Sequence, residues 1–224
     1  LEPLRIPYRE TIRKAASAQG RHKKQTGGAG QFGDCWLRLE PNPGGGYEFL
    51  DEIVGGKIPR QYIPAVDKGI QETLTEGVLA GYPMVDVKVA CYDGSYHPVD
   101  SSEIAFKTAA RIGFRAAAEH ADPVILEPMA NMTITVPDAY AGAVTGDISA
   151  SRGRVTGMDS DGRGNTVVIA TVPFAEITDY STRLRSLSRG TGEFSYELEG
   201  YEQVPYDTAA KLVEAYQKSR SEGR

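Results

Sequence analysis

The sequence predicts an α+β fold divided into two domains. The first half of the chain mixes strand-like and helix-like stretches, and the second half shows the order strand, helix, strand, strand, helix, strand. Between them, "EHADPVILEP" ends an Ala-rich, helix-like stretch at one proline and continues as an extended segment to a second proline. We therefore place a boundary near Asp122, which gives domains over residues 1–121 and 122–205 and a C-terminal helix and tail over residues 206–224.

The first strands and helix of the first domain follow from apolar spacing. In "DCWLRLE", Cys35, Leu37 and Leu39 share one face, which is typical of a half-buried strand, and "PNPGGGYEF" is expected to form a turn. Apolar residues in the stretch 61–77 recur at helical spacing and stop at Gly77, a favourable residue at the end of a helix. The run "PMVDVKVACY" alternates again and predicts a second strand.

A second helix is expected after the loop "YDGSYHPVDSS". Asp100 is a candidate N-cap, with Glu103 three residues later as its capping-box partner. The helix that follows carries an apolar stripe of Phe106, Ala109, Ala110, Gly113 and Ala117.

The second domain has a more regular pattern. Its expected elements are strand 131–136, helix 138–151, strand 154–158, strand 165–172, helix 175–187 and strand 193–204. This β-α-β-β-α-β order predicts a ferredoxin-like domain.

Composition indicates a soluble globular chain in a reducing compartment. The 224 residues contain 40% hydrophobic residues, which is enough for real cores, and no window approaches 18 uninterrupted apolar residues. Cys35 and Cys91 lack Cys-x-x-Cys or zinc spacing and are expected to be buried thiols. We therefore expect a cytoplasmic protein that has no membrane partner.

Positive charge is concentrated near the N-terminus. Residues 5–31 hold seven basic residues and one acidic residue, so this stretch carries +6 while the rest of the chain sums to −11. Such a localised cationic stretch suits a phosphate-bearing partner. A solvated basic face is the alternative that the sequence leaves open.

The glycine-rich run "QTGGAGQFG" matches G-x-G-x-x-G between Gly28 and Gly33. A dinucleotide-binding fingerprint needs a preceding strand and a following helix, but a polar, basic stretch precedes this run and a strand follows it. We therefore reject a dinucleotide site, and no phosphate-binding loop of the G-x-x-x-x-G-K-[ST] type occurs in the sequence. The run instead predicts a loop whose backbone can approach a ligand closely.

His97 lies in the loop before the second predicted helix. Asp93, Asp100 and two serines are near it in sequence, but no nucleophile elbow or metal-ligand spacing accompanies them, so neither hydrolysis nor metal binding is favoured. Because Pro98 favours an extended backbone at the preceding residue, the imidazole is expected to project from the loop. There it could stack on bases or bond to a nucleic acid, as histidines do in RNA-binding proteins. An ordinary turn histidine is the alternative.

Five arginines lie at or just after the ends of the two helices predicted for the second domain. They are Arg152, Arg154, Arg183, Arg185 and Arg189. Cations in a last helical turn interact favourably with the helix dipole without any ligand. If the two helix ends lie together, however, the arginines would form one shared phosphate-binding patch.

The sequence resembles the C-terminal half of elongation factor G, the GTPase that drives ribosomal translocation. The matching runs are "PYRETIRK", "KKQTGGAGQFGD", "EFLDEIVGGKIPRQYIPAV", "GVLAGYPMVDVKV", "YDGSYHPVDSSEIAFK", "DPVILEPM", "SRGRVTGM" and "LRSLSRG". They follow the family order through nearly the whole chain.

The resemblance implies that residues 1–121 are similar to domain IV, an elongated, ribosomal protein S5-like domain that enters the decoding centre. It implies that residues 122–205 are similar to the ferredoxin-like domain V. The domain IV tip, which contacts tRNA, mRNA and rRNA, would consist of Gly27, Gly28, Ala29, Gly30, Gln31, Ser95, Tyr96 and His97. Further candidates for RNA contact are Arg21, Lys23, Lys24 and the five arginines of the second domain.

The resemblance also implies the partners and cofactors. The partner is the ribosome, through its rRNA, tRNA, mRNA and stalk-base proteins, and the protein is expected to act as a monomer. The family's GTPase domain is absent from this sequence, so GTP and Mg would belong to an N-terminal domain of a parent protein, and this segment itself would have no cofactor, metal or catalytic residue. Its beginning at "LEPLRIPYRETI" resembles that of an excised fragment.

Two departures from the family pattern leave the type of factor open. Ala29 stands where translocases usually carry a polar or basic residue, and "SRGTGEF" lacks an arginine that is common between its two glycines. An elongation factor G-like paralogue therefore fits as readily as the main translocase. A ribosome-protection factor is a further alternative, which the retained "GSYH" disfavours. An enzyme built on the His97 loop is the third.

Overall fold

The structure, a computed structural model, describes residues 4–25 and 28–223 in two compact units. The first, called here the N-terminal unit, contains Arg9–Ile125 and the C-terminal segment from Val204. The second, called here the ferredoxin-like unit, contains Leu126–Gln203 and the N-terminal segment through Tyr8. The first unit ends at residue 125, four residues after the predicted end of the first domain at residue 121. The sequence places the N-terminal segment in the first domain and treats the C-terminal helix as a separate segment, whereas the structure groups the former with the second unit and the latter with the first.

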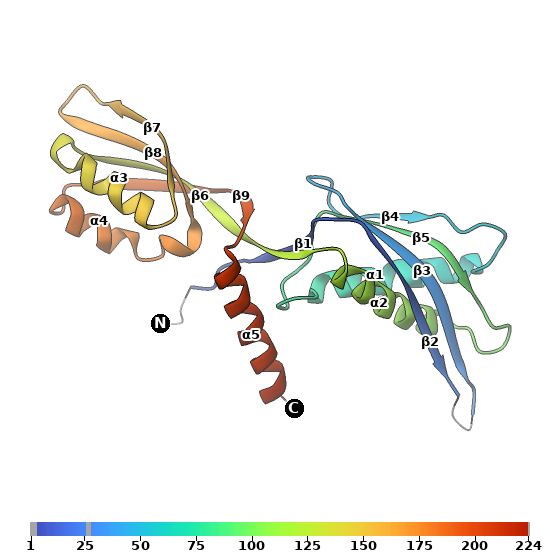
Figure 1. The fold of residues 1–224 in the computed structure, drawn as a ribbon. Coiled ribbons are helices and arrows are strands. Elements are labelled where there is room, and N and C mark those ends of the chain that lie inside the picture. Colours follow the sequence, from blue (N-terminus) through green and yellow to red (C-terminus); the bar gives the residue numbers. More distant parts are fainter. Residues whose placement is uncertain (1–3, 26–27, 224) are drawn as a thin grey trace. The chain divides into compact units, whose positions relative to one another are not determined.

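The N-terminal unit consists of a four-stranded sheet with two helices against one face (Figure 1). The strand order is β2 (Ala16–Lys24), β3 (Gln31–Pro41), β5 (Val87–Ser95) and β4 (Glu48–Asp51). The first two pairings are antiparallel, and β4 runs parallel to β5. The 3-10 turn η1 (Arg60–Tyr62) leads into helix α1 (Ile63–Glu76), and α2 (Glu103–Glu119) follows β5.

The core of this unit lies between the sheet and the helices, as the alternation in the sequence predicts. Cys35, Leu37 and Leu39 of β3 are fully buried, and so is the predicted apolar stripe of α2. Both cysteines are free thiols in this core, and burial raises the pKa of Cys91 to about 12. The predicted inert, buried role of the cysteines is therefore confirmed.

Helix α2 packs onto the sheet backbone without intervening side chains. A Cβ atom on Gly20 of β2 would lie 1.9 Å from the carbonyl oxygen of Ala109 and 2.6 Å from the amide nitrogen of Gly113. A Cβ atom on Gly33 of β3 would lie 2.4 Å from the carbonyl oxygen of Ala105. Real Cβ atoms do not approach other atoms this closely, so glycine is required where β2 and β3 cross the helix.

One local prediction for this unit, the N-cap of α2, was wrong, and two others had inexact bounds. Helix α2 is capped by Ser102, whose Oγ accepts a bond from the amide of Ala105 (3.1 Å), and not by Asp100. The expected turn "PNPGGGYEF" ends in strand β4, which pairs with β5. Strand β5 begins at Val87 because Asp86 has a φ of 57°, in the left-handed region.

Strand β1 (Arg9–Ile12) carries a fully buried carboxylate. The Glu10 side chain accepts bonds from the backbone amides of Val78, Leu79, Ala80 and Tyr82 at 2.7–3.0 Å. A buried charge is tolerated when several donors satisfy its oxygens, so Glu10 fixes the segment that connects α1 to β5.

The ferredoxin-like unit has the element order that the sequence predicts. Its elements are β6 (Pro123–Pro137), η2 (Asp138–Tyr140), α3 (Ala141–Ala150), β7 (Arg154–Ser160), β8 (Asn165–Pro173), η3 (Phe174–Glu176), α4 (Tyr180–Ser188) and β9 (Glu193–Gln203). The strand order is β9-β6-β8-β7 with antiparallel neighbours. Both helices are shorter than expected because each is preceded by a 3-10 turn.

Side chains from α3 and α4 fill the core of the ferredoxin-like unit. Val144, Ile148 and Leu184 pack against alternate residues of β6 and β8, among them Ile134 and Val168. The last helix, α5 (Tyr206–Glu222), has no fully buried residue and belongs to the N-terminal unit. None of the described helices is long and apolar enough to cross a membrane.

We predict that Gly20→Ala destabilises the N-terminal unit by about 2–3 kcal/mol, since its methyl group would overlap the α2 backbone. Gly28→Ala is the matched control, because a Cβ atom there meets nothing within 4 Å, and its effect should stay within about 0.5 kcal/mol. Urea unfolding followed by fluorescence of Trp36, the only tryptophan in the chain, measures both. Equal midpoints for the two variants would contradict the close packing.

Candidate nucleic-acid interface

The glycine-rich loop lies at the end of the hairpin formed by β2 and β3. The last strand pair before it is Lys24 and Gln31. Of the residues proposed for the tip, Gly27 lies outside the described residues, and Gly28 and Ala29 are exposed. A Cβ atom on Gly30 would come within 2.7 Å of an Asp100 carboxylate oxygen, so this glycine permits contact with the loop before α2.

The structure brings the glycine loop and the His97 loop together. The amide of Phe32 donates to the carbonyl oxygen of Asp100 (2.9 Å), and Phe32 forms a parallel bridge with Ser101. The rings of Phe32 and His97 lie with centroids 6.5 Å apart. Two segments more than 60 residues apart in sequence therefore form one surface, which we call the tip: Gly28–Phe32 and Ser95–Ser101.

The sequence predicts that the His97 side chain projects freely from its loop, but in the structure it does not. Its side chain is 50% exposed, but its Nδ1 atom accepts bonds from the backbone amides of Val99 (3.2 Å) and Asp100 (3.0 Å). The ring folds back because these two amides lie within reach when the loop closes over Pro98. Tyr96 beside it is 48% exposed and available for stacking.

Two predicted tip residues use their polar groups inside the structure. The Ser95 hydroxyl donates to Asp34 (2.6 Å), a carboxylate that is only 8% exposed and also accepts a bond from Gln19 (2.7 Å). The Gln31 side chain bonds to the His22 ring (2.7 Å). These contacts join β2, β3 and β5 at the base of the tip. The joined strands support the tip.

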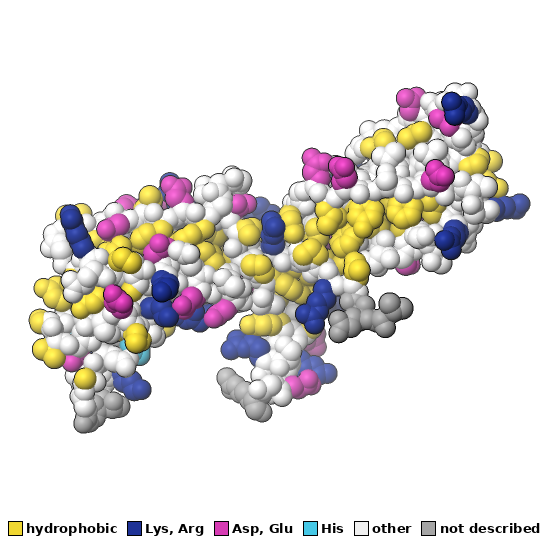
Figure 2. All heavy atoms as spheres, turned by 180° about the vertical axis from the view of Figure 1, so that it is seen from behind, with side chains coloured by type: hydrophobic (Ala, Val, Ile, Leu, Met, Phe, Trp, Pro, Cys, Tyr) yellow, Lys and Arg dark blue, Asp and Glu magenta, His cyan; other side chains and the backbone are white. Residues whose placement is uncertain are grey.

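Cations flank the tip on the β2 side. Arg21, Lys23 and Lys24 are exposed, and the Arg21 guanidinium lies 5.6 Å from the centroid of the Phe32 ring. Lys and Arg side chains are visible at this end of the unit in Figure 2. An exposed arginine held over an aromatic ring can contact a phosphate or stack on a base.

The expected shared arginine patch of the ferredoxin-like unit is not formed. Arg183, in the first turn of α4, bonds to Asp147 (3.3 Å) and Ser151 (3.1 Å) at the end of α3, so the two helices run antiparallel. Their C-terminal ends therefore lie at opposite ends of the unit. Arg189, at the end of α4, lies roughly 9 Å from Arg183 along the helix axis.

Arg152 and Arg183 are held by carboxylates of the ferredoxin-like unit itself. Arg152 makes two bonds of 3.0 Å to Glu127, which is 2% exposed, and a third to Glu176 (3.1 Å). The hydrogen bonds that Arg152 donates to Glu127 are the main cause that raises the pKa of Arg152. Burial alone would lower the pKa of Arg183, but bonds to Asp147 and Asp179 raise it. Both arginines therefore stabilise the ferredoxin-like unit through internal contacts.

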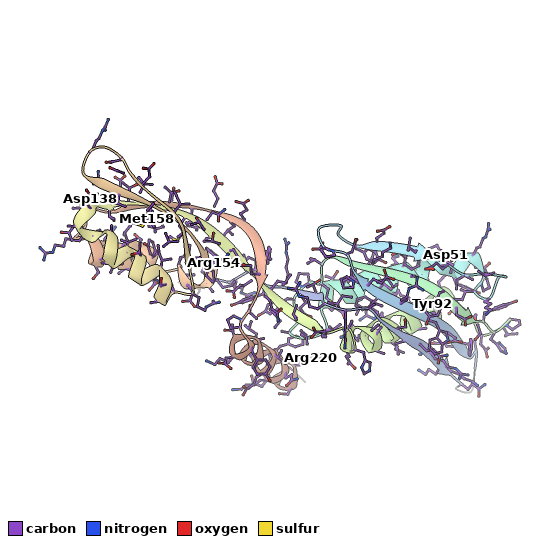
Figure 3. All side chains as sticks on the ribbon, turned by 45° about the horizontal axis from the view of Figure 1, so that its top comes forward. Asp51, Tyr92, Asp138, Arg154, Met158 and Arg220 are labelled. Atoms are coloured by element: carbon purple, nitrogen blue, oxygen red, sulfur yellow. The ribbon has the colours of Figure 1, made fainter. Side chains whose placement is uncertain are left out.

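The remaining three arginines stay available. Arg154 (Figure 3) is 61% exposed and forms one surface ion pair with Glu202 at 3.3 Å, a kind of pair that contributes little to stability. Arg185 and Arg189 are exposed and have no ion pair within residues 4–25 and 28–223. These three remain candidates for RNA contact.

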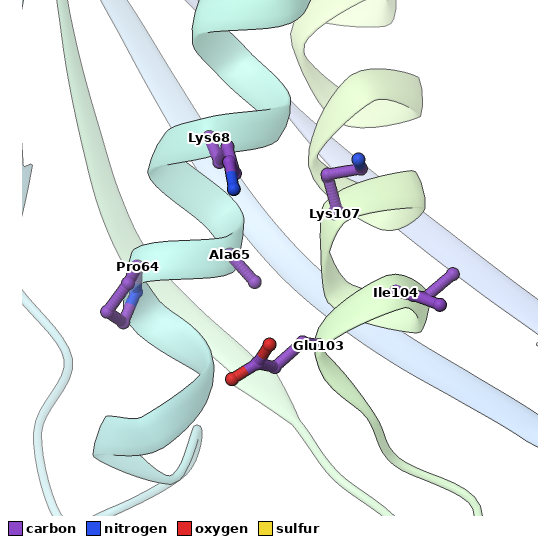
Figure 4. Close-up of a pocket in the computed structure, with 6 residues that line it drawn as sticks. All are labelled: Pro64, Ala65, Lys68, Glu103, Ile104 and Lys107. Atoms are coloured by element: carbon purple, nitrogen blue, oxygen red, sulfur yellow. The ribbon is translucent and has the colours of Figure 1, made fainter.

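The described loops do not assemble a hydrolytic centre. The Ser101 hydroxyl donates to the Phe32 carbonyl and the Ser102 hydroxyl caps α2, so both serine oxygens are used by the backbone. A hollow of about 300 Å³ lies between the first turns of α1 and α2 (Figure 4). Among its lining residues, Lys107 is paired with Glu72. Nowhere in the described residues do three or more His, Cys, Asp or Glu side chains group as metal ligands.

Comparison with known proteins decides the family. The family model for elongation factor G, domain IV, matches residues 4–122, and the model for the elongation factor G C-terminus matches residues 124–212. The chain belongs to the elongation factor G family. It contains domains IV and V, as the resemblance implied.

A solved structure supports this assignment. The chain is similar, with 44% identity and a TM-score of 0.83, to a protein from Thermus thermophilus whose crystal structure is known. The match covers 96% of this elongation factor G-family chain and 32% of that protein. This chain therefore spans about a third of its relative's length.

Sequence reasoning missed three residues that build the tip. They are Asp34, Phe32 and Ser101. The sequence indicates Ser101 only as one of two serines near His97. Phe32 lies within the glycine-rich run, between Gln31 and Gly33, and this position is the one signal that could have identified it. Asp34 gives no signal, because its partners come from two other strands.

We predict that Arg152→Gln destabilises the ferredoxin-like unit by about 2 kcal/mol or more, because it leaves the buried Glu127 carboxylate without its cation. Arg154→Gln, two residues away, should cost less than about 0.5 kcal/mol. Amide hydrogen exchange of β6 and β8 measures the stability of this unit. Similar losses in both variants would argue against an internal role for Arg152.

Proposed function

We propose that this chain is the C-terminal part of an elongation factor G-type GTPase, whose tip enters the ribosomal decoding centre and promotes GTP-dependent translocation of tRNA and mRNA. GTP and Mg would be bound by a further domain of the parent protein. The parent would act in the cytoplasm, and the tip would be its contact with the tRNA–mRNA region.

The joining of the two loops is the observation that carries this proposal. Exposed groups at the tip include the Gly28–Ala29 backbone, the Tyr96 ring and His97. They are supported by bonds that link β2, β3 and β5 below them. A projection that must displace a paired codon and anticodon needs such stiffness, since a loose loop would yield under load.

The charge distribution supports the same function. Arg21, Lys23 and Lys24 place positive charge along the β2 side of the tip, in a chain whose net charge is −5. Such a local cationic region attracts phosphates, while the acidic remainder limits binding to other RNA.

We predict that Gly28→Glu in the parent factor slows single-turnover translocation by about tenfold or more, which corresponds to about 1.4 kcal/mol of activation free energy. The open space around Gly28 accepts the side chain, so the change adds a negative charge where nucleic acid is expected and leaves the fold intact. Ribosome-stimulated GTP hydrolysis should remain largely unchanged.

Gly28→Ala is the matched control and should translocate at nearly the wild-type rate. Equal loss of translocation and GTP hydrolysis in Gly28→Glu, or loss of neither, would contradict the assignment of the tip.

A further inference from the structure

The bonds at His97 determine which ring nitrogen can carry a proton. The Nδ1 atom accepts hydrogen bonds from two backbone amides, those of Val99 and Asp100. A nitrogen that accepts through its lone pair cannot also hold a hydrogen, so the proton of the neutral ring belongs to Nε2. A proton on Nδ1 could instead contact the Asp100 carboxylate, 3.6 Å away, but both backbone bonds would then be lost.

The outer nitrogen of the ring is left free. In the described part of the chain Nε2 of His97 has no hydrogen-bond partner, and the side chain is half exposed. The Phe32 ring lies beside the imidazole, with the ring centroids 6.5 Å apart. The ring therefore presents an outward N–H donor in a fixed direction.

Ser101 connects this ring to the rest of the tip. Its Oγ atom accepts a bond from the His97 amide (2.9 Å) and donates to the Phe32 carbonyl (2.9 Å). The Ser101 carbonyl accepts a bond from the Tyr62 hydroxyl (3.2 Å), which comes from the turn before α1. One serine thus ties the His97 loop to the glycine-loop strand and anchors it to a helix.

We propose that Ser101 is a positioning residue that couples the two tip loops, and that the Val99–Asp100 backbone holds His97 with Nε2–H outward, as a hydrogen-bond donor to an oxygen or nitrogen acceptor of a nucleotide. The nature of the acceptor rests on the proposed function. The coupling and the direction of the donor rest on the geometry alone.

The imidazole has an inner role, in which Nδ1 accepts bonds from the loop backbone, and an outer role, in which Nε2–H is a donor to a nucleotide. Two substitutions separate these roles. Asparagine can replace Nδ1 as a local acceptor of backbone amides but has no group at the position of Nε2. Glutamine reaches the position of Nε2 with an N–H donor but is too long to accept the same local bonds. His97→Asn and His97→Gln are therefore a matched pair.

Hydrogen exchange of the 224-residue chain tests the inner role. The Val99 and Asp100 amides should exchange at similar rates in the wild type and in His97→Asn, and about tenfold faster in His97→Gln, as expected for loss of about 1.4 kcal/mol of protection. Equal exchange of these amides in the wild type and His97→Gln would overturn the assignment of Nδ1 as the acceptor.

The same measurement tests Ser101. In Ser101→Ala the His97 amide loses its acceptor and should exchange about tenfold faster. The Phe32 amide, whose bond to the Asp100 carbonyl joins the two loops, should also exchange about tenfold faster once the Ser101 tie is removed. Ser101→Thr, which keeps the hydroxyl, should resemble the wild type. Faster exchange at His97 with no change at Phe32 would overturn the coupling of the loops. Trp36 fluorescence confirms that each variant is folded.

Single-turnover translocation by the parent factor tests the outer role. His97→Gln should retain at least about threefold more activity than His97→Asn, since only glutamine keeps an outward donor. Equal losses in the two variants would overturn the role of Nε2–H. If no tip variant affected translocation while the exchange pattern held, the proposed function and the nucleotide acceptor would fail, and the positioning by Ser101 would stand.

Discussion

The direct contact between the α2 backbone and the backbones of β2 and β3 is the constraint on which the N-terminal unit depends. Gly20 and Gly33 leave no side chain between strand and helix, so the helix can take only one position along the hairpin. That position sets the first turn of α2 beside Phe32 and brings the preceding loop against the glycine-rich loop. The position of the tip is thus a consequence of how α2 packs against β2 and β3.

Positive charge has different roles in the two units. In the ferredoxin-like unit, Arg152 and Arg183 neutralise carboxylates and hold helix ends, and replacing either would affect the fold first. Around the tip, Arg21, Lys23 and Lys24 are exposed, and the nearest buried carboxylate, Asp34, is satisfied by neutral donors. Within residues 4–25 and 28–223 these three cations have no carboxylate partner, and the same holds for Arg185 and Arg189 in the ferredoxin-like unit.

The sequence was a good guide to elements whose signal is local. Alternation identified β3, helical spacing identified α1 and α2, and the element order identified the ferredoxin-like unit. Prediction from the sequence failed where one residue type suits two different structural roles. Asp100 resembles a cap, but its carboxylate packs against Gly30 and Ser102 caps the helix instead. The pairing of Arg152 with Glu127 joins residues 25 positions apart, so no local pattern encodes it. The orientation of His97 depends on the amides of Val99 and Asp100, which are near in sequence but come within reach of Nδ1 only in the turn that the loop adopts.

An electron cryo-microscopy map of the parent factor bound to a ribosome that carries tRNA and mRNA would show directly whether the tip reaches nucleotides. We expect the backbone of Gly28–Gln31 and the Nε2 atom of His97 to lie within hydrogen-bonding distance of nucleotides in the decoding region, with the Phe32–Ser101 bridge intact. A map in which both loops face open solvent, or in which the two loops have separated, would contradict this expectation.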